Sequence, residues 1–333
     1  MKRWLKISFA LFLTFILLFT LGACSKKEGL KKVRVAEVTR SVFYTPQYVA
    51  IQKGFFKDEG LKIDLKTTAG GDKTMTTLLA NGADIALVGS ETSIYVHAQG
   101  SDDPVINFAQ LTRTDGTFLV SRKKIDNFSW DQLKGSTFLG QRKGGMPQMV
   151  GEYVLKKHSI DPHKDLNLIQ NIDFANIANA FASGTGDFVQ LFEPTASVFE
   201  KEGKGYIVAS FGKESGNVPY TDYMAKESYI KENKDTIEKF VRALYKAEKW
   251  VKDHDSKQVA KVVQPFFEDT DIDILSASIE RYRSQGSFGT DLVLSEDGWN
   301  HLQEIMGEAG ELPKKVDYKA LVNSSIAKKV INE

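Results

Sequence analysis

Apolar strands and amphipathic helices alternate along most of this chain, and this alternation constrains its fold more than any other feature. Residues 33–38 (VRVAEV) alternate apolar and polar side chains, which is the period of a strand. Residues 85–88 (IALV) form a continuous apolar run, typical of a strand covered on both faces. Because strands that alternate with helices build parallel sheets through right-handed crossovers, we predict an α/β protein.

Two successive runs of alternating strands and helices are predicted before residue 228. Strands are expected at residues 33–38, 61–65, 85–88, 137–139, 166–169, 188–192 and 206–209. Helices are expected after residues 45, 70, 89, 146, 176 and 194. A long helix is expected from about residue 230 to His254, and we expect this charged, helical tail to pack against the first half of the chain.

A short internal echo supports two similar halves. LANGADIAL (residues 79–87) and FASGTGDFV (residues 181–189) share the order of helix end, glycine, aspartate and buried strand. A chance match is the alternative. The length of 333 residues also suggests two domains, at roughly 150 residues for each.

The N-terminus has the pattern of an export signal. Lys2, Arg3 and Lys6 precede an apolar stretch at residues 7–21, and small residues lead to Cys24. The sequence LGAC resembles the bacterial lipobox, which implies that the Cys24 thiol receives a diacylglyceryl group and becomes the first residue of the mature chain. An uncleaved membrane anchor is the alternative, but the run is short for a span of about 20 residues.

We therefore expect a signal peptide at residues 1–23 and a polar, lipid-anchored tether at residues 24–32. Acyl chains on Cys24 would hold the protein on the extracytoplasmic face of the bacterial cell membrane. Because Cys24 is the only cysteine, an intramolecular disulfide is excluded.

Composition and motifs argue against several functions. The formal net charge of +1 provides no basic face for nucleic acid. The five histidines lack the spacing of a zinc site, and no G-x-S-x-G elbow is present. We predict no catalytic residue, no metal and no cofactor.

Six strand-to-helix junctions could instead hold a ligand, because ligands of open parallel sheets bind beyond the carboxyl ends of the strands. Helix N-termini at such junctions expose free N–H groups and a partial positive charge. Pro46, Pro147 and Pro194 are predicted at first helical positions. The junctions are residues 41–45, 69–72, 89–92, 141–146, 171–176 and 192–193.

The junction within FLGQRKGGMPQMVGEYV (residues 138–154) is not a nucleotide loop. No Gly-Lys-Ser/Thr follows at Walker spacing, and the glycines do not match G-x-G-x-x-G. A glycine-rich helix entrance beside Arg142 and Lys143 remains. It either contacts a ligand or is a connecting loop with solvated charges.

Several motifs together carry a family resemblance. AIQKGFFKDEGL (residues 50–61), Gly70-Gly71 and NGAD (residues 81–84) occur in that order, and QLKG (residues 132–135) and residues 183–194 follow. From residue 33 to about residue 228 the chain resembles ABC-transporter substrate-binding proteins of the alkanesulfonate and thiamine-precursor type.

This resemblance implies a type II periplasmic-binding-protein fold, with two doubly wound α/β domains around a closing ligand cleft. Domain 1 would comprise residues 33–112 and 213–333, and domain 2 residues 113–212. The resemblance also implies a monomer that delivers a small molecule to an ABC permease and its ATPase subunits.

Side chains near the junctions leave the ligand open. Aromatic rings and Glu193 favour a neutral or cationic nitrogen heterocycle, similar to a thiamine-precursor pyrimidine. Arginines favour a sulfonate, unless Arg40 and Arg113 form salt bridges with Glu37 or Asp115; Glu193 could also cap its own helix. The candidate ligand-binding residues are Arg40, Ser41, Phe43, Tyr44, Gly71, Ser90, Glu91, Thr92, Arg113, Gln141, Arg142, Gly144, Gly145, Met146, Asn171, Phe192 and Glu193.

An extracytoplasmic enzyme on the same fold is the alternative from another class. The related yeast enzymes that make pyrimidine carry a cysteine-rich iron motif, which a chain with one cysteine does not supply. We expect a binding protein, not an enzyme.

Overall fold

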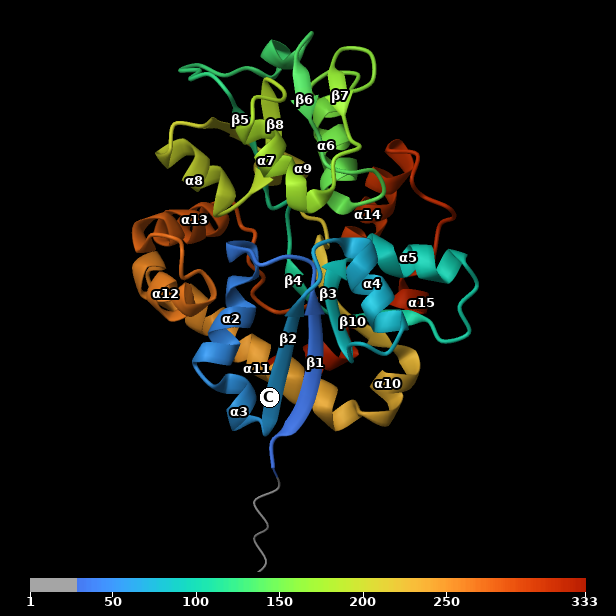
Figure 1. The fold of residues 1–333 in the computed structure, drawn as a ribbon. Helices are drawn as coiled ribbons and strands as arrows, with labels where there is room; N and C mark the ends of the chain where they lie inside the picture. Colours follow the sequence, from blue (N-terminus) through green and yellow to red (C-terminus); the bar gives the residue numbers. More distant parts are fainter. Residues whose placement is uncertain (1–28) are drawn as a thin grey trace, which may run out of the picture. The chain divides into compact units, whose positions relative to one another are not determined.

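The structure is a computed structural model that describes residues 29–333. The expected signal peptide and Cys24 lie outside the described residues, as does most of the expected tether. Residues 31 and 32 of that tether already belong to the first strand. Lys32–Glu333 forms one compact unit. Within this unit, two separate five-stranded sheets each carry their own helices (Figure 1).

The first sheet has the strand order β2-β1-β3-β10-β4. β1 runs parallel to β3, whereas β10 is antiparallel to both β3 and β4. Residues 85–88 are fully buried within β3, as their apolar run predicts. The five strands are β1 (Lys31–Glu37), β2 (Leu61–Thr67), β3 (Ile85–Gly89), β4 (Val105–Thr112) and β10 (Thr221–Lys226).

The second sheet repeats this plan in the order β7-β6-β8-β5-β9. β6 is parallel to β7 and β8, and β5 is antiparallel to β8 and β9. In each sheet the antiparallel strand in fourth place belongs to a segment that crosses between the sheets. The strands are β5 (Thr117–Ser121), β6 (Thr137–Leu139), β7 (Asn167–Ile169), β8 (Phe188–Phe192) and β9 (Tyr206–Ser210).

The two aspartates of the sequence echo make the same contacts in the two sheets. Asp84 accepts a hydrogen bond from the backbone N–H of Arg34 through Oδ2 (2.8 Å) and donates its own N–H to the Arg34 carbonyl (2.9 Å). Asp187 does the same with Thr137, at 2.9 and 2.8 Å. Each aspartate thereby fixes the start of a buried strand against its parallel neighbour.

Short helices connect the strands of both sheets. Pro46 and Pro147 occupy the second position of their helices, not the first, and Pro194 precedes α8 as its N-cap residue. The helices of this part are α2 (Thr45–Gln52), α3 (Phe55–Asp58), α4 (Gly71–Leu79), α5 (Glu91–Ala98), α6 (Met146–Lys157), α7 (Ile177–Ala182), α8 (Thr195–Lys201) and α9 (Phe211–Ser215). Three 3-10 turns accompany them, η1 (Val42–Tyr44), η2 (Trp130–Leu133) and η3 (Phe174–Asn176), and η4 (Gln264–Phe266) lies in the C-terminal part of the described residues.

The C-terminal helices pack against the first sheet and its helices, and two of them also contact helices of the second sheet. The expected long helix is divided at Asn233 into α10 (Glu227–Glu232) and α11 (Lys234–Asp253). α11 packs on α2 and α3, whereas α13 contacts α8 and α14 contacts α6 (Figure 1). The remaining helices are α12 (Ser256–Val263), α13 (Ile272–Ser284), α14 (Glu296–Glu308), α15 (Tyr318–Leu321) and α16 (Ser325–Ile331).

Candidate ligand-binding site

We call each sheet together with its helices a lobe. A cavity of about 190 Å³ lies between the N-termini of helices from the two lobes. It is smaller than the roughly 300–1,000 Å³ of drug-sized pockets, which suits a small solute. We call it the cleft pocket. Its lining comes from the strand ends and helix starts of both lobes and from the segment before β10: Val38, Thr39, Tyr44, Gly70, Gly71, Asp72, Gly89, Glu91, Thr92, Tyr95, Gln141, Arg142, Lys143, Gly144, Gly145, Met146, Pro147, Phe174, Phe192, Tyr220 and Thr221.

Three helices begin at the cleft pocket. α4 and α5 come from the first lobe and begin at Gly71 and Glu91, and α6 comes from the second lobe and begins at Met146. Gly70 and Gly144 have positive φ angles of 146° and 85°, which only glycine adopts readily, so the chain can turn sharply into α4 and α6. Helix N-termini, with their partial positive charge, therefore converge on the cavity from both sides.

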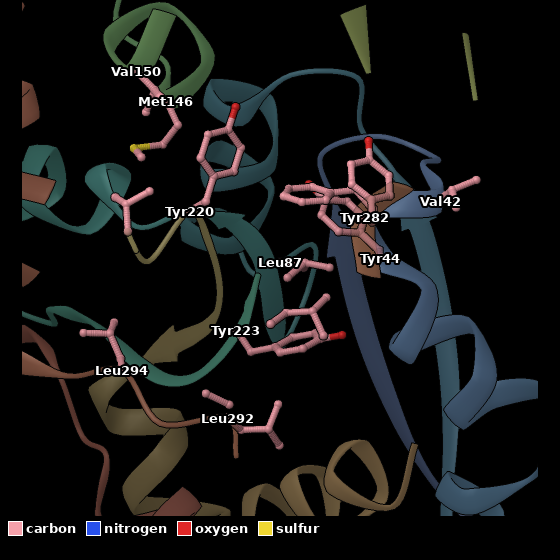
Figure 2. Close-up of a cluster of buried hydrophobic side chains, with 14 of the residues drawn as sticks. Val42, Tyr44, Leu87, Met146, Val150, Tyr220, Tyr223, Tyr282, Leu292 and Leu294 are labelled. Atoms are coloured by element: carbon pink, nitrogen blue, oxygen red, sulfur yellow. The ribbon is translucent and has the colours of Figure 1, made fainter. Parts of the chain in front are cut away.

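Aromatic rings supply much of the apolar wall. Tyr44 and Tyr220 are 3% and 2% exposed, and Phe174 and Phe192 lie with their ring centroids 5.9 Å apart. Figure 2 shows Tyr44, Tyr220 and Met146 arriving from three separate segments. Such walls suit a flat ring better than a compact inorganic ion.

Glu91 places a carboxyl group in this cavity. Its side chain is buried, Oε1 accepts a hydrogen bond from the Met146 amide across the cleft (3.3 Å), and Oε2 has no hydrogen-bond partner. Burial raises the pKa of Glu91 to about 8, with a further contribution from Asp222, while backbone amides of Glu91, Met146 and Thr92 act in the opposite direction.

A second compartment of about 180 Å³ adjoins the cleft pocket and shares part of its wall, including Gln141, Phe174 and Phe192. Arg40, Ser41 and Glu193 line it. Ser41 Oγ donates to the Glu193 carbonyl (2.7 Å), which ties the start of η1 to the end of β8.

Glu193 is already engaged within the protein. Its two carboxylate oxygens accept hydrogen bonds from the Ser197 amide (2.9 Å) and hydroxyl (2.8 Å), so it caps α8. It also forms an ion pair with Arg281 of α13. The helix-capping alternative for Glu193 is therefore realised.

The three candidate arginines are all paired. Arg40 Nε lies 3.0 Å from Glu37, and Arg142 lies 2.7 Å from Asp72 on the opposite side of the cleft pocket. Arg113 pairs with Asp291, not with Asp115, which the sequence offered as an alternative partner, and it lines a different groove beside Lys213 and Gly286.

The structure brings most of the predicted site residues together. Tyr44, Gly71, Glu91, Thr92, Gln141, Arg142, Gly144, Gly145, Met146 and Phe192 line the cleft pocket, and Arg40, Ser41 and Glu193 line the second compartment.

The other four predicted residues lie elsewhere. Phe43 is fully buried against Tyr282, with 4.9 Å between ring centroids, because η1 turns its ring into the core. Ser90 Oγ lies within hydrogen-bond distance of the Pro219 carbonyl and Asp222. Arg113 is held by Asp291, and Asn171 is exposed outside both compartments.

Six lining residues lie outside the predicted junctions: Val38, Thr39, Tyr95, Pro147, Tyr220 and Thr221. Tyr95 lies one helical turn after Glu91, so the helical period could have identified it. Tyr220 and Thr221 lie at the start of β10, and they were missed because that strand was not predicted.

Residues 29–333 lack two features, a cluster of metal ligands and a membrane-spanning helix. In this part of the chain, no group of three or more His, Cys, Asp or Glu side chains could hold a metal ion. The same residues include no helix that is long and apolar enough to cross a membrane.

Two α/β lobes with a solute-sized pocket between their helix starts define a small-molecule-binding protein with the periplasmic-binding-protein fold. Residues 42–257 match the model of the family described as NMT1/THI5 like. The chain belongs to this family.

Relatives and solved structures agree with this assignment. The chain is 65% identical to the "Putative binding protein YtlA" of Bacillus subtilis over 100% of both chains. It is 24% identical to the formylaminopyrimidine-binding protein of Halalkalibacterium halodurans, over 87% of this chain and 89% of that protein. The alkanesulfonate-binding protein SsuA of Xanthomonas axonopodis shares the fold, with a TM-score of 0.70 at 17% identity, over 88% of this chain and 98% of SsuA.

Proposed function

We propose that this chain is the solute-binding lipoprotein of an ABC importer. It captures a small nitrogen heterocycle in the cleft pocket and delivers it to the permease. The observation that carries this proposal is the convergence of helix N-termini from two lobes on one small cavity. Closure of domain 1 (residues 33–112 and 213–333) on domain 2 (residues 113–212) would present the loaded form to the permease.

The lining of the cleft pocket supports a ring with nitrogen substituents, resembling a thiamine-precursor pyrimidine. Aromatic side chains form its walls, and a buried carboxyl group reaches into it. The three candidate arginines, Arg40, Arg113 and Arg142, form ion pairs with acidic side chains of the protein. A relative named for formylaminopyrimidine binding, at 24% identity, points to the same ligand class.

An alkanesulfonate or taurine-like anion is the second candidate ligand. Arg142 and Lys143 line the cleft pocket and both are exposed, and helix N-termini bind anions in many proteins. The fold is also that of an alkanesulfonate-binding protein. The two candidates differ in the charge that the ligand carries.

The proposed setting follows from the N-terminal sequence. A diacylglyceryl group on Cys24 would hold the protein on the extracytoplasmic face of the cell membrane, next to the permease and ATPase subunits. Labelling of cells with a radioactive fatty acid tests this: the wild-type chain should be labelled, and Cys24→Ser should not.

The ligand is tested by mass spectrometry of small molecules that co-purify with the protein. A melting-shift screen of aminopyrimidines, flavins and sulfonates complements it. A nitrogen heterocycle recovered unchanged supports the proposal. Conversion of the recovered compound by the purified protein would instead support an enzyme, and the absence of both a recovered molecule and any melting shift would contradict binding.

A further inference from the structure

The carboxyl group of Glu91 occupies the place where an anion would be expected to bind. The Met146 amide, at the start of α6, donates a hydrogen bond to it, and the backbone amides of Glu91 and Thr92, at the start of α5, lower its pKa. Helix N-termini attract negative charge because their N–H groups are free and their dipoles are positive there. The chain thus supplies its own acidic group to N-termini from both lobes.

This arrangement works against an incoming anion. A sulfonate that approached these N–H groups would have to displace the Glu91 carboxyl group, which occupies this place, and above the pKa of Glu91 it would also meet a like charge. Removal of that group would leave the amides free. An uncharged amide at the same position would still accept from Met146 and would place an N–H donor where Oε2 lies in the wild type.

The second carboxyl oxygen of Glu91 favours a ligand that carries hydrogen-bond donors. Oε2 is buried, lacks a partner and belongs to a residue that lines the cleft pocket. A buried polar atom without a partner is costly, and a ligand N–H would remove that cost. Both protonation states of Glu91 match an amino-substituted ring. The ionised and the protonated side chain can each accept a hydrogen bond from the amino group, and the protonated side chain can also donate one to a ring nitrogen.

We infer that Glu91 is the selectivity residue of the cleft pocket: it excludes sulfonates and similar anions from the paired helix N-termini and binds the amino group of a nitrogen heterocycle. This inference rests on the proposed function for its site, and it adds the residue that decides between the two candidate ligand classes.

The test compares wild type, Glu91→Gln and Glu91→Ala by calorimetry with three probes. 4-Amino-2,5-dimethylpyrimidine and 2,4,5-trimethylpyrimidine differ only by an amino group in place of a methyl group, and butanesulfonate is the anion. Glu248→Gln is the matched control, because Glu248 is also a buried acid with unpartnered oxygens but does not line the cleft pocket. Circular dichroism confirms that each variant is folded.

Wild type and Glu248→Gln should prefer the aminopyrimidine and bind butanesulfonate weakly. Glu91→Gln should lose about tenfold to a hundredfold in preference for the amino over the methyl ring, and gain about tenfold in butanesulfonate affinity. Glu91→Ala should gain butanesulfonate affinity as well. Tight butanesulfonate binding by wild type, or unchanged binding of all three probes in folded Glu91 variants, would overturn the inference.

The proposed ligand class can fail separately. If wild type binds neither pyrimidine but the Glu91 variants still gain butanesulfonate, anion exclusion by Glu91 stands and the aminopyrimidine is the wrong ligand. If Glu91→Gln and Glu91→Ala also fail to gain butanesulfonate, the role of Glu91 is refuted.

Discussion

The Glu91 carboxyl oxygen Oε1 accepts a hydrogen bond from the Met146 amide at 3.3 Å, so one side chain joins the N-terminus of α5 to that of α6. These helices belong to different lobes. The contact places an acidic group at the centre of the cleft, between two positive helix ends. The proposed ligand choice and the proposed lobe closure would therefore depend on the same few atoms.

The Asp72–Arg142 ion pair should favour the closed cleft without contributing much to stability. Both side chains are about half exposed, and such pairs contribute about 0–1 kcal/mol. Asp72→Asn should therefore leave the melting temperature nearly unchanged but accelerate ligand dissociation several-fold at low salt. Stopped-flow measurements at two ionic strengths test this, and the difference should shrink in high salt. Equal dissociation rates at low salt would show that the pair has no role in closure.

Stability should fall as pH rises from about 4 to about 8. Burial raises the pKa of Asp222 and of Glu91 to about 8 and that of Asp115 to about 7. Because these folded-state pKa values exceed the unfolded values of about 4, the folded state binds more protons. The stabilisation is complete below the unfolded pKa, is lost progressively as pH rises between the unfolded and folded pKa values, and is gone above about pH 8.

Urea unfolding at several pH values measures this slope. Asp222→Asn removes one of these groups and should flatten the profile by up to about 1.4 kcal/mol per pH unit. Asp222 is fully buried, and Asn can still accept from Ser90. A variant with the wild-type slope would show that Asp222 titrates normally in the folded protein.

Gly116→Ala should destabilise the crossover into the second lobe. A Cβ at Gly116 would lie 2.7 Å from Cε1 of Phe43, and that ring is fully buried. Overpacking of this kind costs about 1–3 kcal/mol. Gly307→Ala, in α14, is the control: its Cβ would lie 3.9 Å from Leu312, so it should be neutral or stabilising by about 0.5–1 kcal/mol. Equal denaturation midpoints for the two variants would contradict the packing argument.

Glu193→Gln should affect stability more than ligand choice. The change removes the negative charge that pairs with Arg281 and weakens the cap of α8. Because Arg281 is partly exposed, we expect a loss of about 1–3 kcal/mol, below the range for fully buried pairs. Chemical denaturation and calorimetry, run beside Glu91→Gln, separate the two effects. A larger loss of amino-group preference in Glu193→Gln than in Glu91→Gln would reverse the assigned roles.

The strands that sequence reasoning predicted are those with clear periodicity or an apolar run, such as β1, β3 and β8. β4, β5 and β10 were missed. β4 is fully buried although it carries Asn107 and Gln110. Asn107 donates a hydrogen bond to Ser93 of α5, which is a tertiary contact, and Gln110 donates to the Thr112 carbonyl at the end of the strand. Local patterns do not report such compensation, so a buried polar strand resembles a loop.

The candidate site was predictable to the level of junctions but not of side-chain direction. The general rule for strand ends located residues 89–92 and 141–146. It did not reveal that Phe43 turns into the core or that Glu193 pairs with Arg281, because both contacts involve α13, far along the chain. In the sequence, Glu91 and Glu193 are equally suitable as ligand-binding acids. Only the structure shows that Oε2 of Glu91 lacks a hydrogen-bond partner, whereas both carboxylate oxygens of Glu193 are bonded to Ser197.

Small-angle X-ray scattering tests most directly whether two lobes close on a captured solute. The purified protein is first stripped of bound molecules by unfolding, dialysis and refolding. A protein-free metabolite extract of the producing cells is then added, so the ligand need not be known. We predict a smaller radius of gyration with the extract than without it, and a weaker response in Glu91→Ala. A radius that stays the same at every extract concentration would contradict solute capture in the cleft.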